Sequence, residues 1–258
     1  MKTPAILVAI PAYNCEKQIL RVLEEFDEKL LSRIKKVVII DNISSDNTVN
    51  SALSAIKKIA SPKFEVWKNK NNYHLGGSHK VAFLMGEKNK FDYVAILHGD
   101  NQAETQELNL LIDEAIKHPE AGAILGSRFM KESRLKGYSI ERIIGNRIIN
   151  AIYTVVALRP CLDLGSGLNL FKIKDLRDNR YLGFEDSITF NIDLLLDYFK
   201  KKTIIRFVPI TWKEEDQVSN ARNFSVGKNA LIKLFKWRLN KEVFTNHHKS
   251  YYNSKRIQ

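Results

Sequence analysis

The stretch KVVIIDNISSDNT, residues 36–48, decides the fold prediction. An apolar run of strand length, Lys36 to Ile40, is followed at once by polar residues, and Asp46 to Ile59 then has the periodicity of a helix. The preceding residues have the same order, with a predicted strand at Ala5 to Ile10, the sequence PAYN, and a predicted helix at Cys15 to Leu31. Two strand–helix units in succession predict βαβ connections and a mainly parallel sheet.

The alternation continues along the chain, so we expect one α/β domain. The further predicted strands are Phe64 to Lys68, Tyr93 to Leu97, Ala121 to Gly126 and Ile204 to Trp212, and the further predicted helices are Ser78 to Lys88, Thr105 to Lys117, Ile140 to Leu158 and Asp186 to Lys200. A basic loop at Phe129 to Tyr138 and a glycine-rich segment at Leu164 to Phe171 separate the later elements. Because parallel sheets bind ligands at the carboxyl ends of their strands, polar residues there are the functional candidates.

The composition fits one globular domain with a large core: 258 residues, of which 44% are hydrophobic and 27% charged. The apolar runs are far too short to span a bilayer, and the first residues lack the apolar stretch of a signal peptide. We therefore expect a cytoplasmic protein. Cys15 and Cys161 are expected to be reduced and packed, since no Cys or Cys/His cluster suggests a disulfide framework or zinc.

The net charge of +12 is concentrated near the C-terminus, where residues 217–258 contain nine Lys or Arg side chains and one Glu. Within this segment, Val226 to Leu239 interleaves apolar side chains, Phe235 and Trp237 among them, with lysines and Arg238. Such a basic amphipathic helix either lies on an anionic membrane or packs on its own domain with its lysines in water.

Polar motifs follow the first two predicted strands. The first is the run Pro11 to Asn14 with Glu16, and the second begins at Asp41. A carboxylate at a strand end can accept hydrogen bonds from a base or a ribose, and Ser45 or Asp46 can cap the next helix. The alternative is that the first run is only a turn and the second only a loop with a helix cap.

Together these two runs resemble the P-x-Y-N and D-D-x-S-x-D-x-T signatures of glycosyltransferase family 2. Gly76 and Gly77, with Ala82, are similar to that family's G-x-G-x-A-x-N region, although the later Asn is absent and Gly77 could simply start a helix. The resemblance covers about residues 5–222. It implies a GT-A fold, an α/β architecture with a mainly parallel central sheet and helices on both faces, and a UDP- or GDP-sugar donor. The residues that it implies at the donor are Pro11, Tyr13, Asn14, Glu16, Asp41, Asn42, Ser44, Gly76, Gly77, Lys80, Asp100 and Lys213.

Asp100 follows the fourth predicted strand in the sequence LHGDNQ, residues 97–102. It stands where the family has a D-x-D motif that holds Mg²⁺ or Mn²⁺ against the donor diphosphate. His98 replaces the first Asp, and Gln102 matches the D-x-D-x-Q form of the polyprenol-phosphate sugar synthase-like branch. The resemblance therefore implies a hard divalent cation at Asp100, Gln102 and His98. Alternatively, Asp100 is structural and His98 is a hydrogen-bonded core histidine.

Later motifs are similar to the same branch. The run Gly126 to Arg128 resembles its G-S/T-R, in which the Arg faces the donor diphosphate or the acceptor, and Asp163 to Leu168 matches its D-x-x-S-G-F/L. Arg142, Asn146 and Asn150 share one helix face and resemble its R-x-x-x-S-x-x-x-N, unless they form only a solvated polar stripe.

Two carboxylates compete for the role of catalytic base. Asp186, preceded by Glu185, resembles the general base of inverting family 2 enzymes, whereas Asp193 stands in the branch's later helix. A hydroxyl acceptor must lose a proton and would suit Asp186, but a phosphate acceptor is already ionised and needs no base. Either carboxylate could instead be a helix N-terminal residue that interacts with the dipole. With Arg128, these two Asp residues are the predicted catalytic residues.

The last match is Trp212-Lys213, with Ser219, Asn220 and Arg222 in the following loop. It resembles a segment in which a cation clamps the diphosphate, although Glu214, Glu215 and Asp216 make the loop acidic here. We accordingly expect a catalytic domain at residues 1–222 and a basic amphipathic tail at residues 223–258.

The resemblance thus implies an inverting, metal-dependent glycosyltransferase that moves a sugar to a lipid-linked saccharide or polyprenyl phosphate, in bacterial cell-surface polysaccharide assembly. Membrane contact would be peripheral, at the inner face. Two alternatives differ in class. A nucleic-acid-binding protein has only the pI of about 9.5 in its favour, because no such motif is present and strand-end acids repel phosphates. A nucleotidyltransferase of similar fold would need a glycine-rich loop with a basic residue near Pro11, where none occurs.

Overall fold

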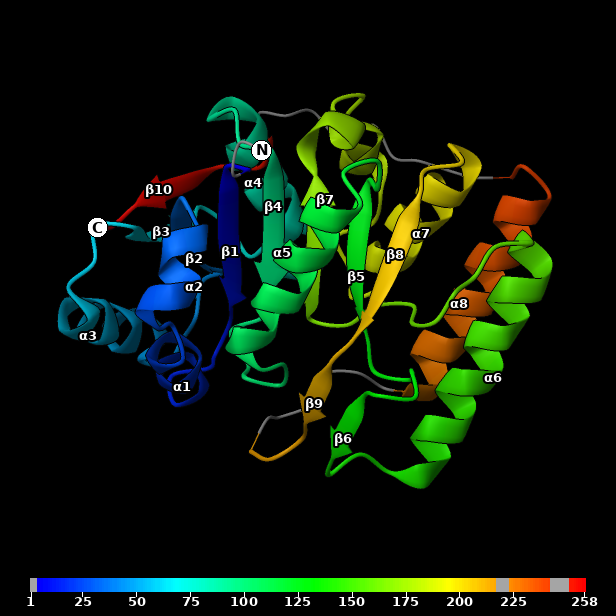
Figure 1. The fold of residues 1–258 in the computed structure, drawn as a ribbon, viewed down its shortest axis with the longest axis horizontal. Helices are drawn as coiled ribbons and strands as arrows, with labels where there is room; N and C mark the ends of the chain where they lie inside the picture. The colour runs from blue at the N-terminus through cyan, green and yellow to red at the C-terminus, as the bar shows by residue number, and fades with distance from the viewer. Residues whose placement is uncertain (1–3, 217–222, 242–250) are drawn as a thin grey trace.

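The computed structural model describes residues 4–216, 223–241 and 251–258. Figure 1 shows a central sheet with helices on both faces, as predicted, and its eight strands have the order β10-β3-β2-β1-β4-β7-β5-β8. These strands are β1 (Ile6–Ala12), β2 (Lys36–Asp41), β3 (Phe64–Asn69), β4 (Tyr93–Leu97), β5 (Ala123–Ser127), β7 (Leu168–Lys172), β8 (Ile205–Pro209) and β10 (Ser254–Arg256). A second, two-stranded sheet pairs β6 (Arg134–Lys136) with β9 (Thr211–Lys213).

The helices are α1 (Gln18–Glu24), α2 (Glu28–Arg33), α3 (Thr48–Ile59), α4 (His74–Lys88), α5 (Leu108–Lys117), α6 (Ile140–Ala157), α7 (Phe190–Lys200) and α8 (Asn223–Arg238), with 3₁₀ turns at Thr105–Glu107, Ile173–Leu176 and Arg180–Gly183. None of the helices in the described ranges is long and apolar enough to cross a membrane.

Two strands of the main sheet were not predicted. β7 begins in the glycine-rich segment Leu164 to Phe171, where no strand was predicted, and it runs antiparallel between β4 and β5. β10 pairs antiparallel with β3 at the sheet edge. The predicted strand Ile204 to Trp212 is interrupted at Ile210, after which the chain leaves the main sheet and pairs with β6.

Three predicted helices need correction, one because it is interrupted and two because they begin elsewhere. The single helix Cys15 to Leu31 is two helices, because Asp27 caps α2 by accepting from the Leu30 backbone N at 2.8 Å. α4 begins at His74, so it includes the glycine pair in its first turn. α7 begins at Phe190, so Asp186 lies in the preceding loop and not at a helix terminus.

The two faces of the sheet bury separate apolar layers because strand side chains alternate. From β1, Ile6, Val8 and Ile10 join a cluster with α1, α2, α3 and α5, whereas Leu7 and Ala9 join one with α4 and α7. Figure 1 shows α5 in front of the sheet and α4 and α7 behind it.

The segment predicted as a tail packs at two places on the rest of the molecule. α8 lies beside α6 at one end of the molecule (Figure 1), and its buried Ala230 and Leu234 join a third cluster with α6 and α7. β10 extends the opposite edge of the sheet. Both predicted thiols, Cys15 and Cys161, are buried and free.

Candidate functional site

The carboxyl ends of β2, β1 and β4 meet at one edge of the sheet, since these strands are adjacent and parallel. The backbone N of Asn42 donates to the carbonyl O of Ala12 at 2.9 Å, and the N of Gly99 donates to the O of Pro11 at 2.9 Å. The predicted residues at Pro11, Asp41 and Asp100 therefore lie on the same edge.

The loops after β1 and β2 are bonded to one another by their own side chains. The backbone N of Asn14 donates to Ser44 Oγ at 3.0 Å, and Asn14 Oδ1 accepts from the N of Ser45 at 2.8 Å. Glu16 Oε2 accepts from the N of Asn47 at 3.1 Å. Three residues of the predicted donor site, Asn14, Glu16 and Ser44, thus hold the two loops together.

Asp41 ends β2 and has no exposed surface. Its carboxylate accepts from the Ser44 backbone N at 3.3 Å and lies 3.7 Å from Lys68 Nζ. The next residue, Asn42, is also buried, and its side chain bonds three neighbours before α4: Asn69, Asn72 and the backbone of Tyr73. Tyr13, in contrast, is exposed at the end of the β1 loop.

Asp100 is partly buried just after β4, and Oδ1 accepts from the backbone N of Gln102 at 3.3 Å. Burial raises the pKa of Asp100, and the nearby His98 opposes this rise. The carbonyl O of Gln102 accepts from the N of Lys213 at 2.7 Å, which brings Lys213 to the same edge. The Nζ atom of Lys213 lies 3.8 Å from Glu25 Oε1.

His98 forms a pair with the fully buried His79 of α4, their Nε2 atoms 3.1 Å apart. Burial lowers the pKa of both rings, so both are neutral near pH 7 and one donates to the other. Gly167 makes room for this pair, because a Cβ there would stand 2.8 Å from His98 Nδ1.

A preformed metal cage does not exist in the described residues, where no group of three or more His, Cys, Asp or Glu side chains could hold an ion. The predicted ligand set contains one carboxylate, that of Asp100. The Nε2 atom of its histidine, His98, is directed at His79. Mg²⁺ is commonly held by one or two carboxylates together with substrate phosphates. The residues therefore fit a cation held mainly by a nucleotide diphosphate.

Gly76 and Gly77 allow α4 to approach the loop that carries Asp186. A Cβ on Gly76 would lie 2.7 Å from Phe190 Cβ and 2.8 Å from the carbonyl O of Glu185, and the N of Gly76 donates to the O of Asp186 at 2.8 Å. In this structure the glycines serve packing between α4 and that loop. Their contact with a nucleotide stays a prediction.

Lys80, another predicted donor residue, is completely buried. Its Nζ donates to Asp186 Oδ1 at 2.7 Å, and three further oxygens accept from it: Leu182 O, Phe184 O and Tyr252 Oη. Tyr252 also donates to Asp186 Oδ1 at 2.9 Å. The ammonium of Lys80 thus compensates the carboxylate of Asp186.

Asp193 is paired in the same way. Both of its carboxylate oxygens accept from Lys233 Nζ of α8 at 2.8 Å, and Glu185 Oε2 lies 3.2 Å from the same ammonium. Burial raises the pKa of Asp193, and the ion pair with Lys233 opposes this rise.

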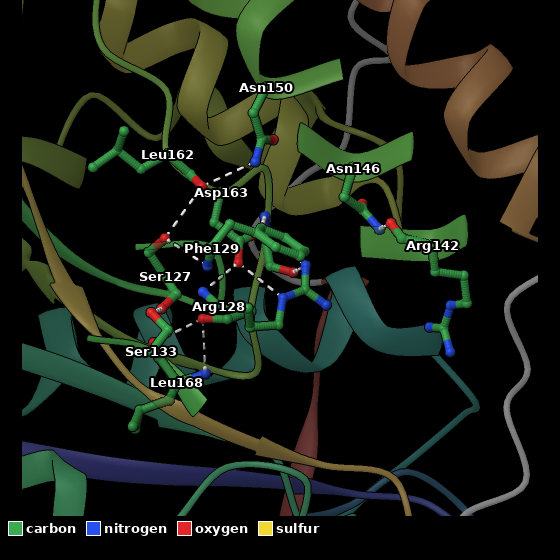
Figure 2. A network of polar contacts seen from close by, with 12 residues as sticks. Ser127, Arg128, Phe129, Ser133, Arg142, Asn146, Asn150, Leu162, Asp163 and Leu168 are labelled. Atoms are coloured by element: carbon green, nitrogen blue, oxygen red, sulfur yellow. Dashed lines mark hydrogen bonds and ion pairs between the residues drawn. The ribbon is translucent and has the colours of Figure 1, made fainter. Parts of the chain in front are cut away.

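Arg128 follows β5 and forms a bidentate ion pair with Asp163, with Nε and Nη2 each 2.8 Å from a carboxylate oxygen (Figure 2). Nη2 also donates to Gly165 O at 3.0 Å, and the guanidinium lies 5.0 Å from the Trp212 ring. Asp163 is almost completely buried, so this pair fixes the course of the chain after β5.

The three predicted polar residues of α6 bond other groups of the chain and are not the solvated stripe considered above. Asn150 Nδ2 donates to Leu162 O at 2.9 Å, and Asn146 Nδ2 donates to Arg142 O at 2.7 Å (Figure 2). Arg142 pairs with Glu214 at 2.5 Å and stacks on the Tyr138 ring at 4.1 Å.

The structure thus separates the predicted site residues into two groups. Pro11, Asp41, Asp100 and Lys213 share the strand-end edge. The other group is bound in ion pairs: Arg128 with Asp163, Asp186 with Lys80, and Asp193 with Lys233. The sequence reasoning missed His79, Lys233 and Tyr252, because each acquires its partner through tertiary contacts. Ser219, Asn220 and Arg222 lie outside the described residues.

The chain is similar to known proteins in sequence and in fold. Residues 7–178 match the family described as Glycosyl transferase family 2. An uncharacterized protein of Methanocaldococcus jannaschii is 24% identical over 240 residues, covering 89% of this chain and 99% of that protein. The dolichyl-phosphate beta-glucosyltransferase of Saccharomyces cerevisiae is 27% identical over 232 residues, covering 81% of this chain and 67% of that protein.

Among solved structures, glucosyl-3-phosphoglycerate synthase from Mycobacterium tuberculosis, in complex with Mn²⁺, UDP-glucose and phosphoglyceric acid, is similar with a TM-score of 0.68. The two sequences are 14% identical over 93% of this chain and 81% of that one. At this identity the likeness establishes the fold, which is the predicted GT-A fold.

Proposed function

Because the chain belongs to glycosyl transferase family 2, we propose that it transfers a sugar from a UDP- or GDP-sugar to a polyprenyl phosphate, with inversion at the anomeric carbon. The donor would bind along the edge of Pro11, Asp41 and Asp100. The relative that acts on dolichyl phosphate supports an acceptor of this class.

One observation favours a phosphate over a hydroxyl acceptor: each candidate base already faces a lysine ammonium. Asp186 is bonded to the buried Lys80, and Asp193 is bonded to Lys233. A general base must take up a proton, which would neutralise the carboxylate. For Asp186 this would leave the buried ammonium of Lys80 without its carboxylate. A phosphate acceptor is already ionised and requires no proton transfer.

The proposed step is a direct displacement. An acceptor phosphate oxygen forms a bond to the anomeric carbon while the bond from that carbon to the donor diphosphate breaks. The nucleoside diphosphate leaves with the bonding electron pair, and no proton moves. A Mg²⁺ or Mn²⁺ ion bound at Asp100 would offset the charge that develops on the leaving diphosphate. Lys213, on the same edge, would add a fixed positive charge.

The experiment uses the purified full chain with Mn²⁺, a panel of UDP- and GDP-sugars, and a short polyprenyl phosphate in detergent. Released nucleotide and glycosylated lipid are measured by mass spectrometry. We expect product with the polyprenyl phosphate and none with the matching polyprenol, and we expect EDTA to abolish turnover until Mn²⁺ is restored.

The role of the two carboxylates is tested with Asp186→Asn and Asp193→Asn, after thermal unfolding shows that each variant is folded. General base catalysis contributes about 10²- to 10⁴-fold. Each folded variant should therefore retain kcat within about tenfold of the parent. A loss of kcat above about 100-fold in Asp186→Asn alone, with the acid limb of the pH profile removed, would instead identify Asp186 as a base for a hydroxyl acceptor.

A further inference from the structure

Helix α6 is apolar on two opposite faces. Its inner face contributes Ile149, Tyr153 and Val156 to the cluster with α7 and α8. Its outer face carries four large apolar side chains that are 54–71% exposed: Ile140, Ile144, Ile148 and Val155. At 3.6 residues per turn these positions form one stripe along the whole helix. Exposed apolar patches of this extent, bordered by polar residues, mark sites of contact with a partner or a membrane.

Helix α8 runs beside α6 and has an exposed apolar face of its own. Tyr153 Oη donates to the carbonyl O of Ala230 at 2.6 Å, and a Cβ on Gly227 would lie 3.2 Å from Ile149 Cδ1. These contacts place the two helices side by side, as Figure 1 shows. The exposed apolar residues of α8 are Ile232, Phe235 and Leu239, the last at its C-terminal end.

The charges beside these apolar residues are almost all positive. Exposed basic side chains are Arg147 on α6 and Lys228, Lys236 and Arg238 on α8. The sequence of α8 contains no Asp or Glu, and α6 contains only Glu141. We propose that the outer face, defined as the exposed apolar residues of α6 and α8 with these four cations, docks on an anionic lipid bilayer.

A bilayer explains both properties of the outer face. The acyl chains take up the apolar side chains, and anionic head groups attract the flanking lysines and arginines. A second copy of the chain, related by a two-fold axis, would bring two surfaces of the same positive charge together. The charge pattern therefore favours lipid over self-association.

The position of the outer face connects it to the site. α6 begins at Ile140, next to Tyr138, whose ring lies 6.0 Å from the Arg128 guanidinium and 4.1 Å from that of Arg142. Figure 1 shows this end of α6 beside β6 and β9. A bilayer on the outer face would present lipid head groups near that end. This connection to the acceptor rests on the proposed function, whereas the docking itself does not.

The test is flotation of the full chain with vesicles, without donor or acceptor. Vesicles of phosphatidylcholine with phosphatidylglycerol are compared with phosphatidylcholine alone, at low and high salt. Substitutions are used because deleting α8 would remove the buried Ala230 and Leu234. The test variant is Ile144→Glu/Ile148→Glu. The matched control is Leu110→Glu/Ile116→Glu on α5, where exposure is 43% and 41%.

We expect the parent to float with anionic vesicles and to bind more weakly at high salt. The α6 variant should lose at least about tenfold in partition coefficient, because it places two charges where apolar groups were buried in lipid. The α5 control should bind as the parent does, and Lys228→Gln/Lys236→Gln should lose the preference for anionic vesicles.

Equal vesicle binding by the parent and the α6 variant would overturn the proposal. So would a lipid-free parent that is dimeric by sedimentation while the α6 variant is monomeric, since the outer face would then be a protein interface. Failure of the proposed function gives a different result: the chain binds vesicles but forms no product with short polyprenyl phosphate in detergent.

Discussion

The loops after β1 and β2 and the region around β5, α6 and α7 hold their polar groups in different ways. In the first region, the side chains of Asn14, Ser44 and Glu16 accept hydrogen bonds from backbone N–H groups of the two loops. In the second, buried charges are paired across long sequence separations, as in Arg128 with Asp163. Neutral hydrogen bonds contribute modestly, whereas breaking a buried ion pair leaves an uncompensated charge. The two regions should therefore respond very differently to the loss of one polar group.

The largest effect is expected from Asp163→Ala, which leaves the guanidinium of Arg128 without its carboxylate. Removing one partner of a buried pair costs about 3–5 kcal/mol. Urea unfolding should show this loss in the free energy of unfolding. The control is Asp113→Ala, which breaks a pair with Arg33 in which Asp113 is 66% exposed. It should cost less than about 1 kcal/mol. Equal losses of unfolding free energy in the two variants would show that the buried ion pair is no more stabilising than the exposed one.

The second prediction concerns Glu107, whose two carboxylate oxygens accept from the backbone N of Thr211 at 2.8 Å and so join the 3₁₀ turn before α5 to β9. Burial raises the pKa of Glu107 from 4.5 to about 7. The folded state therefore holds the proton more tightly than the unfolded state. This stabilisation is complete below about pH 4.5 and is lost as pH rises through about 7.

Relative to Glu107→Gln, the parent should therefore lose up to about 3 kcal/mol of unfolding free energy between those limits. Urea unfolding at a series of pH values measures the difference. If the unfolding free energies of the parent and the variant changed with pH in parallel, the pKa of Glu107 would be the same in the folded and unfolded states.

The third prediction tests the donor edge. Asp41→Ala removes a buried carboxylate proposed to accept from the base or ribose, and loss of a charged hydrogen bond costs about 1.5–3 kcal/mol. Calorimetric titration with UDP and GDP in Mn²⁺ should show about 10- to 150-fold weaker binding. The control, Asp92→Ala, removes a carboxylate at the opposite end of the strands, where it accepts from the N of Ala5 at 2.8 Å. A change below about threefold in Asp41→Ala would exclude this role.

The smallest effect is expected from Ser44→Ala, which removes one acceptor of the bonds between the two loops. A neutral hydrogen bond of this kind contributes about 0.5–1.5 kcal/mol. Thermal unfolding should register a correspondingly small decrease in stability. If Ser44→Ala were as damaging as Asp163→Ala, the two regions would not differ in the way described.

Much of the fold could be predicted because its first strands are continuous apolar runs. Tyr93 to Leu97 is an example, since both faces of that strand are buried. β10 could not be predicted, because Ser254 to Arg256 is polar and is a strand only through pairing with β3. The break between α1 and α2 was missed because the apolar spacing continues past the Asp27 cap.

Some residues of the candidate site could likewise be predicted from the sequence, and others could not. Asp41 and Asp100 could be placed from sequence, because each directly follows an apolar strand and parallel strand ends share an edge. The partners of Asp186 and Asp193 could not, since Lys80 is 106 residues from Asp186 and Lys233 is 40 residues from Asp193. Nothing in the local sequence distinguishes these lysines from solvated ones.

The pairing of β10 with β3 also determines when the sheet can be completed during synthesis. β3 ends at residue 69, but the strand that pairs with its outer edge is formed by residues 254–256, and residues 253, 257 and 258 bond the same edge. Until that part of the chain leaves the ribosome, the backbone N–H and C=O groups on that edge have no strand partner. Open edges of this kind template pairing between chains. The nascent protein should therefore be prone to aggregation through this edge from the time β3 is formed until β10 has been synthesised and has paired with it.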